Sequence, residues 1–197
     1  RRRHRAGIDR VEVAPGRQHV GAAPGRSPGG SGSDEAPGET ILYERARRLR
    51  NLGKKEEASA AYVECATKYP YPYGAHFDDA LFHASELEEE LGRPKEAVAL
   101  LLRMLHEREV AHMMGSYQRP LYDDALFRAA KLSEEKLGDR ARARELYHQL
   151  FTDHTTSILR DDAIWREAEL WQADGDGSKA CSRLEDMVDK LPDTRYV

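Results

Sequence analysis

Three pairs of adjacent aspartates come closest, in type and spacing, to a catalytic or metal-binding pattern. They occupy positions 78–79, 123–124 and 161–162, and each pair is followed by Ala. Paired carboxylates can act as the acid and base of a glycosidase, or they can bind a hard cation such as Ca²⁺. Here, however, the pair stands at equivalent places in three repeated segments, and a reaction rarely needs three copies of its catalytic groups. The pattern therefore predicts a structural role for these aspartates.

Two other stretches resemble metal sites but lack a required feature. His106 and His112 in "HEREVAH" are six residues apart, whereas the zinc-protease motif needs histidines four apart on one helical face. Residues 174–185, "DGDGSKACSRLE", have Lys179 where the sharp turn of a calcium loop needs Gly. The side chains at the calcium-loop positions are Asp174, Asp176, Ser178, Ser182 and Glu185. We predict no catalytic residue, no metal, no cofactor and no enzymatic activity.

The composition is that of a charged, water-soluble chain. Of the 197 residues, 40% are hydrophobic and 34% are charged, and no run of apolar residues is long enough to span a membrane. The net charge is −4, but residues 1–33 hold seven Arg against one Asp and one Glu, which leaves −9 for the remainder. An acidic body argues against a nucleic-acid surface on the folded part. Cys65 and Cys181 form no redox motif, and their apolar helical positions predict that both are buried.

Residues 1–38 differ in kind from the rest. The stretch "APGRQHVGAAPGRSPGGSGSDEAPGE" is rich in Gly, Pro, Ser and Ala and has neither a helical nor a strand period. Such a segment buries too little apolar surface to offset the entropy of ordering it. We expect a flexible linker or disordered arm, whose opening "RRRHR" either binds an anionic surface or is simply solvated.

From residue 39 onward the chain repeats a helix–turn–helix pattern four times. A Gly closes the first helix of each unit, at positions 53, 92, 138 and 175, and an Ala follows five residues later each time. Gly can adopt the left-handed conformation that ends a helix, and Ala lets the second helix pack closely against the first. The third unit carries one extra residue before its Gly.

This arrangement resembles the tetratricopeptide repeat. Unit one has the family's pattern of small, apolar and turn residues at Ala46, Leu49, Gly53, Ala58, Tyr62, Cys65 and Pro70, and unit four has it at Ala168, Trp171, Gly175, Ala180, Leu184, Met187 and Pro192. The resemblance implies an all-α solenoid over residues 39–197, with repeats at about 39–72, 78–111, 123–157 and 161–194. It implies nothing about a reaction.

A narrower resemblance concerns the spacing of the repeats. A connector leads into Asp-Asp-Ala at residues 78–80, 123–125 and 161–163, and the first aspartate is expected to cap the helix while both carboxylates interact with the helix dipole. This pattern looks like the bacterial envelope subgroup, which includes the outer-membrane-protein assembly lipoprotein and the Tol–Pal cell-division coordinator. The resemblance implies a periplasmic or outer-membrane-associated protein.

Stacked helix pairs form an inner, concave face that commonly holds a peptide or partner helix. The predicted partner-binding residues on this face are Tyr43, Arg47, Arg50, His83, Glu86, Arg128, Lys131, Arg166 and Glu169. The cations Arg47, Arg128, Lys131 and Arg166 either attract an acidic or carboxylate-ended partner or are ordinary solvated charges. Met113, Met114 and Tyr117 in the second connector either contact a partner or pack on the second helix of repeat two.

Two functions are compatible with these features. The first is a non-catalytic scaffold that binds a protein partner in envelope assembly or cell division. The alternative is a regulatory or sensory repeat domain of a larger cytoplasmic protein, joined to an upstream module through the Gly/Pro arm. The last helix presents Leu184, Met187, Val188 and Leu191, and one repeat can cover only some of them. We therefore expect that the natural chain continues or that this edge docks on a partner or a second copy.

Overall fold

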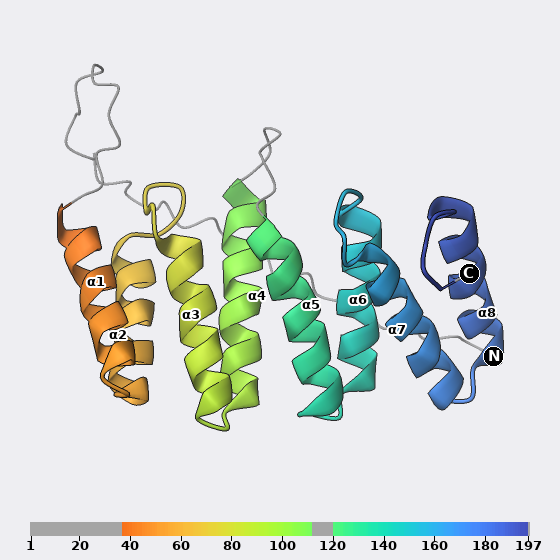
Figure 1. Cartoon of the computed structure of the whole chain (residues 1–197), viewed down its shortest axis with the longest axis horizontal. Helices are drawn as coiled ribbons and strands as arrows, with labels where there is room; N and C mark the ends of the chain where they lie inside the picture. The colour runs from red at the N-terminus through yellow and green to blue at the C-terminus, as the bar shows by residue number, and fades with distance from the viewer. Residues whose placement is uncertain (1–36, 112–119, 197) are drawn as a thin grey trace, which may run out of the picture. The chain divides into compact units, whose positions relative to one another are not determined.

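A computed structural model describes residues 37–111 and 120–196, and within these ranges the chain forms eight helices and no strand (Figure 1). Their bounds are α1 Pro37–Asn51, α2 Lys55–Lys68, α3 Phe77–Glu90, α4 Pro94–Ala111, α5 Pro120–Glu135, α6 Arg140–Asp153, α7 Arg160–Ala173 and α8 Gly177–Lys190. The all-α prediction is confirmed.

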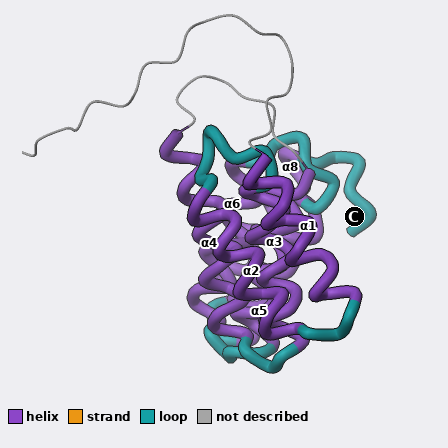
Figure 2. The backbone as a smooth tube through the Cα atoms, turned by 90° about the vertical axis from the view of Figure 1, so that its left-hand side faces the viewer, coloured by secondary structure: helices purple, strands orange, loops and turns teal. Residues whose placement is uncertain are grey.

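Each helix packs on the helix before it and the helix after it along the whole array. The helices overlap in an end-on view, with the connecting loops gathered at the two ends of the helices (Figure 2). This is a solenoid of four helix pairs, in which one buried hydrophobic cluster extends from α1 to α7 and a second, of Phe151, Ile164 and Met187, lies between α6, α7 and α8. None of the described helices is long and apolar enough to cross a bilayer.

The turn inside each pair follows the predicted chemistry. Gly53, Gly92, Gly138 and Gly175 have φ values of 73°, 74°, 67° and 84°. In the first pair the N–H of Lys54 donates to the carbonyl of Leu49 at 3.0 Å, a hydrogen bond typical of a helix that ends in a left-handed Gly. Ala58, Ala97 and Ala143 are fully buried and Ala180 is 5% exposed, as the close approach of the two helices requires.

The extra residue of the third repeat is accommodated in this same turn. The N–H of Asp139 reaches back to the carbonyl of Ser133 at 2.8 Å, so the closing hydrogen bond spans one residue more than in the first repeat. The wider turn leaves Ala143 at its buried place. The insertion therefore does not shift the packing of α6.

The first aspartate of each pair fastens its helix to a segment farther along the chain. Oδ2 of Asp78 accepts from the hydroxyl of Tyr122, and Oδ1 of Asp123 lies 2.5 Å from Nδ1 of His154. Oδ2 of Asp161 accepts from Thr194 at 3.3 Å. Each partner lies beyond the second helix of the repeat that holds the carboxylate. These aspartates therefore join successive parts of the solenoid.

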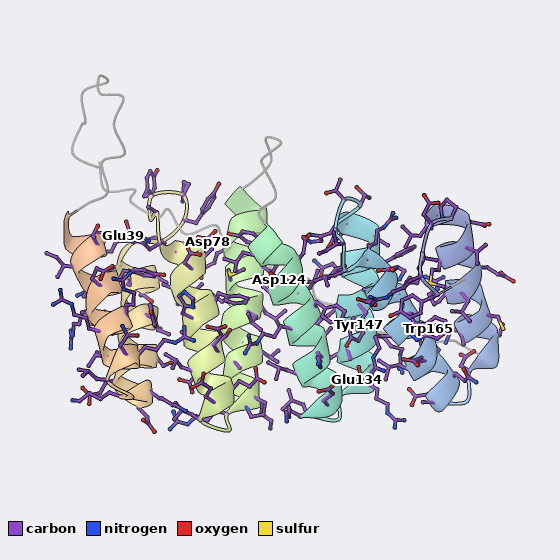
Figure 3. All side chains as sticks on the ribbon, viewed as in Figure 1. Glu39, Asp78, Asp124, Glu134, Tyr147 and Trp165 are labelled. Carbon is purple, nitrogen blue, oxygen red and sulfur yellow. The ribbon has the colours of Figure 1, made fainter. Side chains whose placement is uncertain are left out.

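Repeat one uses a glutamate for the same purpose, which the sequence reading did not anticipate. Glu39 stands fourteen residues before Gly53, as Asp78 stands before Gly92, and its Oε1 accepts from the backbone N–H of His76 at 2.7 Å. Both acids lie near the same end of their helices (Figure 3). The prediction that the first aspartate caps its helix is wrong for α3 and α7, because their cap residues are His76 and Leu159 and neither helix has a side-chain cap hydrogen bond. Asp78 lies inside the first turn instead.

The segment after α8 folds back onto α7. The ring of Tyr196 stacks on Trp165 with centroids 4.6 Å apart, and its hydroxyl donates to Asp162.

On α8, Met187 is 1% exposed, whereas Val188 is 47% exposed. Cys65 is buried as predicted, but the prediction for Cys181 is wrong because its side chain is exposed. The equivalent Ser59 bonds to Glu88 of the following repeat, and no helix follows α8 in the described part of the chain.

Candidate groove on the first helices

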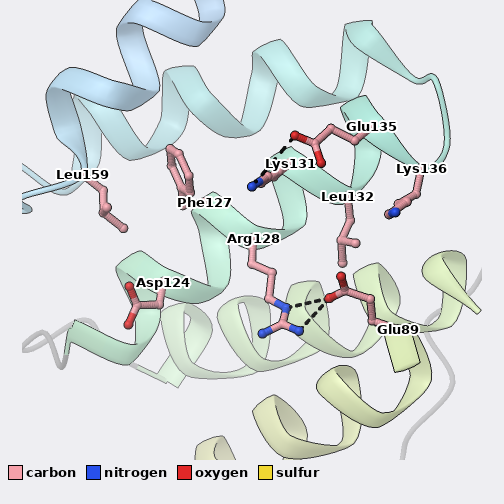
Figure 4. Close-up of a pocket in the computed structure, with 9 residues that line it drawn as sticks. All are labelled: Glu89, Asp124, Phe127, Arg128, Lys131, Leu132, Glu135, Lys136 and Leu159. Carbon is pink, nitrogen blue, oxygen red and sulfur yellow. Dashed lines mark hydrogen bonds and ion pairs between the residues drawn. The ribbon is translucent and has the colours of Figure 1, made fainter. Parts of the chain in front are cut away.

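A groove runs along α5 between the end of α3 and the start of α7 (Figure 4). Its volume is about 430 Å³. The lining residues are Glu89, Asp124, Phe127, Arg128, Lys131, Leu132, Glu135, Lys136 and Leu159. Most of them belong to α5 and recur at three-to-four spacing, so they form one stripe on that helix. From Asp124 to Glu135 the stripe is about 16 Å long at the rise of an α-helix.

A second hollow of about 260 Å³ continues the groove towards the C-terminus. It shares Phe127, Lys131 and Glu135 with the first and adds Arg166 of α7 and Tyr196. The segment after α8 therefore contributes a wall to this face. We use the term α5 groove for both hollows together.

The arginines of this face are paired across neighbouring repeats. Nη2 of Arg50 on α1 lies 2.9 Å from Glu86 on α3, and Nη2 of Arg128 on α5 lies 2.6 Å from Glu89. Arg166 on α7 pairs with Glu134 on α5. Arg128 and Arg166 thus each pair with a carboxylate of the preceding first helix, whereas Arg50 pairs with a carboxylate of the following one. A charge ladder runs along the face from α1 to α7.

Glu86 of the ladder and Tyr147, which donates to the ladder residue Glu134, have shifted pKa values. A hydrogen bond with His83 and the charge of Arg50 hold the pKa of Glu86 below its usual range, against the opposing effect of its partial burial. Burial raises the pKa of Tyr147, as does Glu134, to which the Tyr147 hydroxyl donates at 3.1 Å. Glu86 is therefore ionised at neutral pH, and Tyr147 is protonated.

Asp124 gives one end of the α5 groove an acidic group. Partial burial and the adjacent Asp123 raise the pKa of Asp124. Lys131 and Lys136 lie farther along the same stripe, and Lys131 approaches Glu135 only at 3.9 Å. The groove thus has the Asp124 carboxylate at the start of α5 and the two ammonium groups towards its end, where Glu135 lies between the lysines in sequence, and Phe127 and Leu159 provide apolar surface.

The structure distributes the other predicted partner-binding residues as follows. Arg47 is exposed and pairs with Glu44 on its own helix at 3.0 Å, and Glu169 pairs with Arg166 at 2.8 Å. The ring of Tyr43 stacks on His76 at 4.3 Å, outside the α5 groove. The connector residues Met113, Met114 and Tyr117 lie outside the described residues.

Sequence reasoning identified Arg128, Lys131 and Arg166 but missed Phe127, Lys136 and Leu159. The helical spacing of Asp124, Phe127 and Lys131 was a usable signal for one of them. Leu159 gave no such signal, because it lies in a connector and reaches the groove only through the packing of α7 beside α5.

The calcium-like stretch has other roles in the structure. Asp174 accepts from Arg140 at 2.8 Å and also binds Arg144, and Asp176 accepts from the N–H of Lys179 at 3.0 Å at the start of α8. Within residues 37–111 and 120–196, no group of three or more metal-binding side chains is placed to hold an ion.

Comparison with known proteins agrees with the repeat architecture. Residues 124–157, which cover most of α5 and all of α6, match the family model for the tetratricopeptide repeat. Repeats of this family are generally non-catalytic scaffolds for protein–protein interaction. No curated protein matches the sequence at a significant level.

Solved structures share the fold at low sequence identity. The crystal structure of MamA has a TM-score of 0.54 and 12% identity, with 81% of each chain covered. A putative kinesin light chain from Podosopora anserina with nearly identical TPR-like repeats has a TM-score of 0.52 and 19% identity, with 79% of this chain and 75% of that chain covered. These similarities establish the fold alone.

Proposed function

We propose that this chain is a non-catalytic scaffold that binds an extended peptide segment of a partner protein in the α5 groove. The observation that carries the proposal is the stripe along α5 and the residue that follows it, where a carboxylate, an aromatic ring and two ammonium groups line connected hollows. A length of about 16 Å accommodates about five residues of extended chain.

The polarity of the groove favours a defined direction for the peptide. A basic or N-terminal group would lie near Asp124, an apolar side chain on Phe127 and Leu159, and an acidic or C-terminal carboxylate near Lys131 and Lys136. Arg128 and Arg166 are already neutralised by Glu89 and Glu134. These arginines therefore position the walls, and the lysines provide the attraction for an anionic group.

The test uses the full chain and a displayed library of short random peptides. Peptides selected on the wild-type protein are synthesised with a fluorophore, and their affinities are measured by anisotropy for Phe127→Ala, Lys131→Glu and the control Lys95→Glu. Lys95 is exposed on α4 and lines no part of the groove. Loss of binding in the two groove variants, with the control unchanged, is the expected result. Equal binding by all three would refute the groove as the site.

We further propose that the scaffold acts in the bacterial envelope, in assembly or cell division. The support is the repeat spacing and the connector that leads into Asp-Asp-Ala in three repeats. Fractionation of cells that carry the gene, followed by immunoblotting with an antibody to this chain, tests the compartment. Recovery from the periplasmic or outer-membrane fraction is expected, whereas recovery from the cytosol would contradict it.

The second candidate function is that of a regulatory domain of a larger cytoplasmic protein. The observation that favours it is the Gly/Pro-rich stretch before residue 39, whose composition is typical of a linker between domains. The complete gene distinguishes the two candidates. A signal peptide or lipid-attachment site upstream supports the envelope scaffold, and an upstream kinase or receiver domain supports the regulatory one.

A further inference from the structure

The outward side of α8 is exposed at positions that are buried in repeats one and two. The residues six, nine and thirteen positions after the turn Gly are Ser59, Tyr62 and Ala66 in repeat one, and Val98, Leu101 and Leu105 in repeat two. All six are 8% exposed or less. The matching residues of repeat four are Cys181, Leu184 and Val188, of which Cys181 and Val188 are exposed. Repeat four thus presents one half of an inter-repeat junction.

The outward side of α1 presents the other half. Ile41 and Leu52 are 67% and 72% exposed, and they line a hollow of about 340 Å³ together with Glu44, Arg45, Arg48 and Leu49. Counted back from the turn Gly, Ile41 matches Ala80 and Ala163, which are fully buried. This is therefore the side that an inner first helix presses onto the preceding repeat.

The two edges carry opposite charges. Arg45 and Arg48 flank the hollow on α1, while Glu185 and Asp189 flank Val188 on α8. Among the described residues, no ion pair involves Arg48, Glu185 or Asp189, and Arg45 reaches Glu64 only at 3.9 Å. The four groups thus have their charges available for a facing surface.

We propose that α1 of a second copy covers the outward side of α8, so that copies associate head to tail. The junction continues the solenoid, with Val188 and Leu184 entering the hollow beside Ile41 and Leu52, and with Arg45 and Arg48 facing Glu185 and Asp189. Because the two surfaces differ, the contact is heterologous and can propagate into chains. Side chains larger than Ala at the junction make it wider than an inner one, which favours reversible association.

The experiment is sedimentation velocity on the full chain over a wide range of concentrations, with three proteins compared. The wild type is expected to grow from monomer to dimer and longer species, and to dissociate at high salt because the pairs are screened. Arg48→Glu and Glu185→Arg should each remain monomeric, since each places like charges across the junction. All these positions are exposed, and circular dichroism verifies that the variants are folded.

An equimolar mixture of the two variants gives the decisive result. Glu185 of the Arg48→Glu protein can face the intact Arg48 of the Glu185→Arg protein. At the next junction, the arginine introduced by Glu185→Arg can face the glutamate introduced by Arg48→Glu. Mixed chains are therefore expected to reassemble. A wild type that stays monomeric at every concentration overturns the proposal. Association that persists in Arg48→Glu alone also overturns it, because it would identify a contact that does not use the charged edge of α1.

Discussion

The hydroxyl of Tyr122 donates a 3.1 Å hydrogen bond to Oδ2 of Asp78, and this buried contact joins the start of α5 to the start of α3. The two residues are 4% and 5% exposed. The bond fixes where the third repeat begins relative to the second, although the connector between them contains residues that the structure does not describe. It therefore bears on the geometry of the α5 groove, whose walls come from both helices.

Replacing Tyr122 by Phe removes this donor while keeping the ring. We expect the free energy of unfolding, measured by urea denaturation, to fall by about 1–3 kcal/mol, because a buried carboxyl loses one of its hydrogen bonds. Tyr73→Phe is the matched control, since Tyr73 is 88% exposed. Equal stability of the two variants would show that the contact contributes nothing.

Two glycines in the last turn should respond oppositely to Ala. At Gly175, φ is +84°, so Ala is expected to lower the free energy of unfolding by about 1–2 kcal/mol through backbone strain. Gly177 is the first residue of α8. Ala at this position should raise the free energy of unfolding by about 0.4–1 kcal/mol, because it restricts the conformations of the unfolded chain. A Cβ at either position meets no atom within 4 Å, so packing does not confound the comparison. Changes of the same sign in urea denaturation would contradict this interpretation.

The two thiols should differ in reactivity. Burial, with smaller contributions from Glu39 and Glu64, raises the pKa of Cys65 to about 11, whereas Cys181 is exposed. In dilute native protein, a chromogenic disulfide reagent is expected to modify Cys181 rapidly and Cys65 only on the time scale of unfolding. Cys181→Ser should abolish the rapid phase, and Cys65→Ser should preserve it. A rapid phase that survives in Cys181→Ser would show that α2 opens readily.

Glu86 should contribute stability that acid removes. Its pKa is depressed in the folded protein, so its contribution is present above the ordinary pKa of Glu, about 4.3, and is lost as pH falls through the lower folded value. We expect Glu86→Gln to lower the free energy of unfolding at pH 7 by about 1 kcal/mol or less, as for a partly exposed ion pair. The variant should also lose less stability than wild type between neutral and acidic pH.

Glu145→Gln is the control for this measurement. Glu145 is an exposed residue that pairs with Arg142 on the same helix at 2.9 Å. The control should leave the neutral-to-acid difference of the wild type intact. If Glu86→Gln retains the full acid sensitivity of the wild type, the link between α1 and α3 does not stabilise the fold.

The charge ladder illustrates how far the sequence allowed the site to be predicted. Helical spacing was enough to place Arg128 and Arg166 on the exposed side of the first helices. It did not reveal that Glu89 and Glu134 lie opposite them, because each pair is separated by more than thirty residues and by a complete second helix. Leu159 was missed for the same reason.

The sequence by itself determined the helix pairs, their turns and the alanines at which the second helix of each pair packs on the first. These features depend on local periodicity and on the backbone freedom of Gly53 and its three equivalents. The tertiary structure alone decided which side chains meet between repeats and which edges stay open. Cys181 occupies the same helical position as the buried Ser59, and it is exposed only because no further helix packs on α8 in the described part of the chain. Burial at that position is a property of the neighbouring repeat and not of the residue.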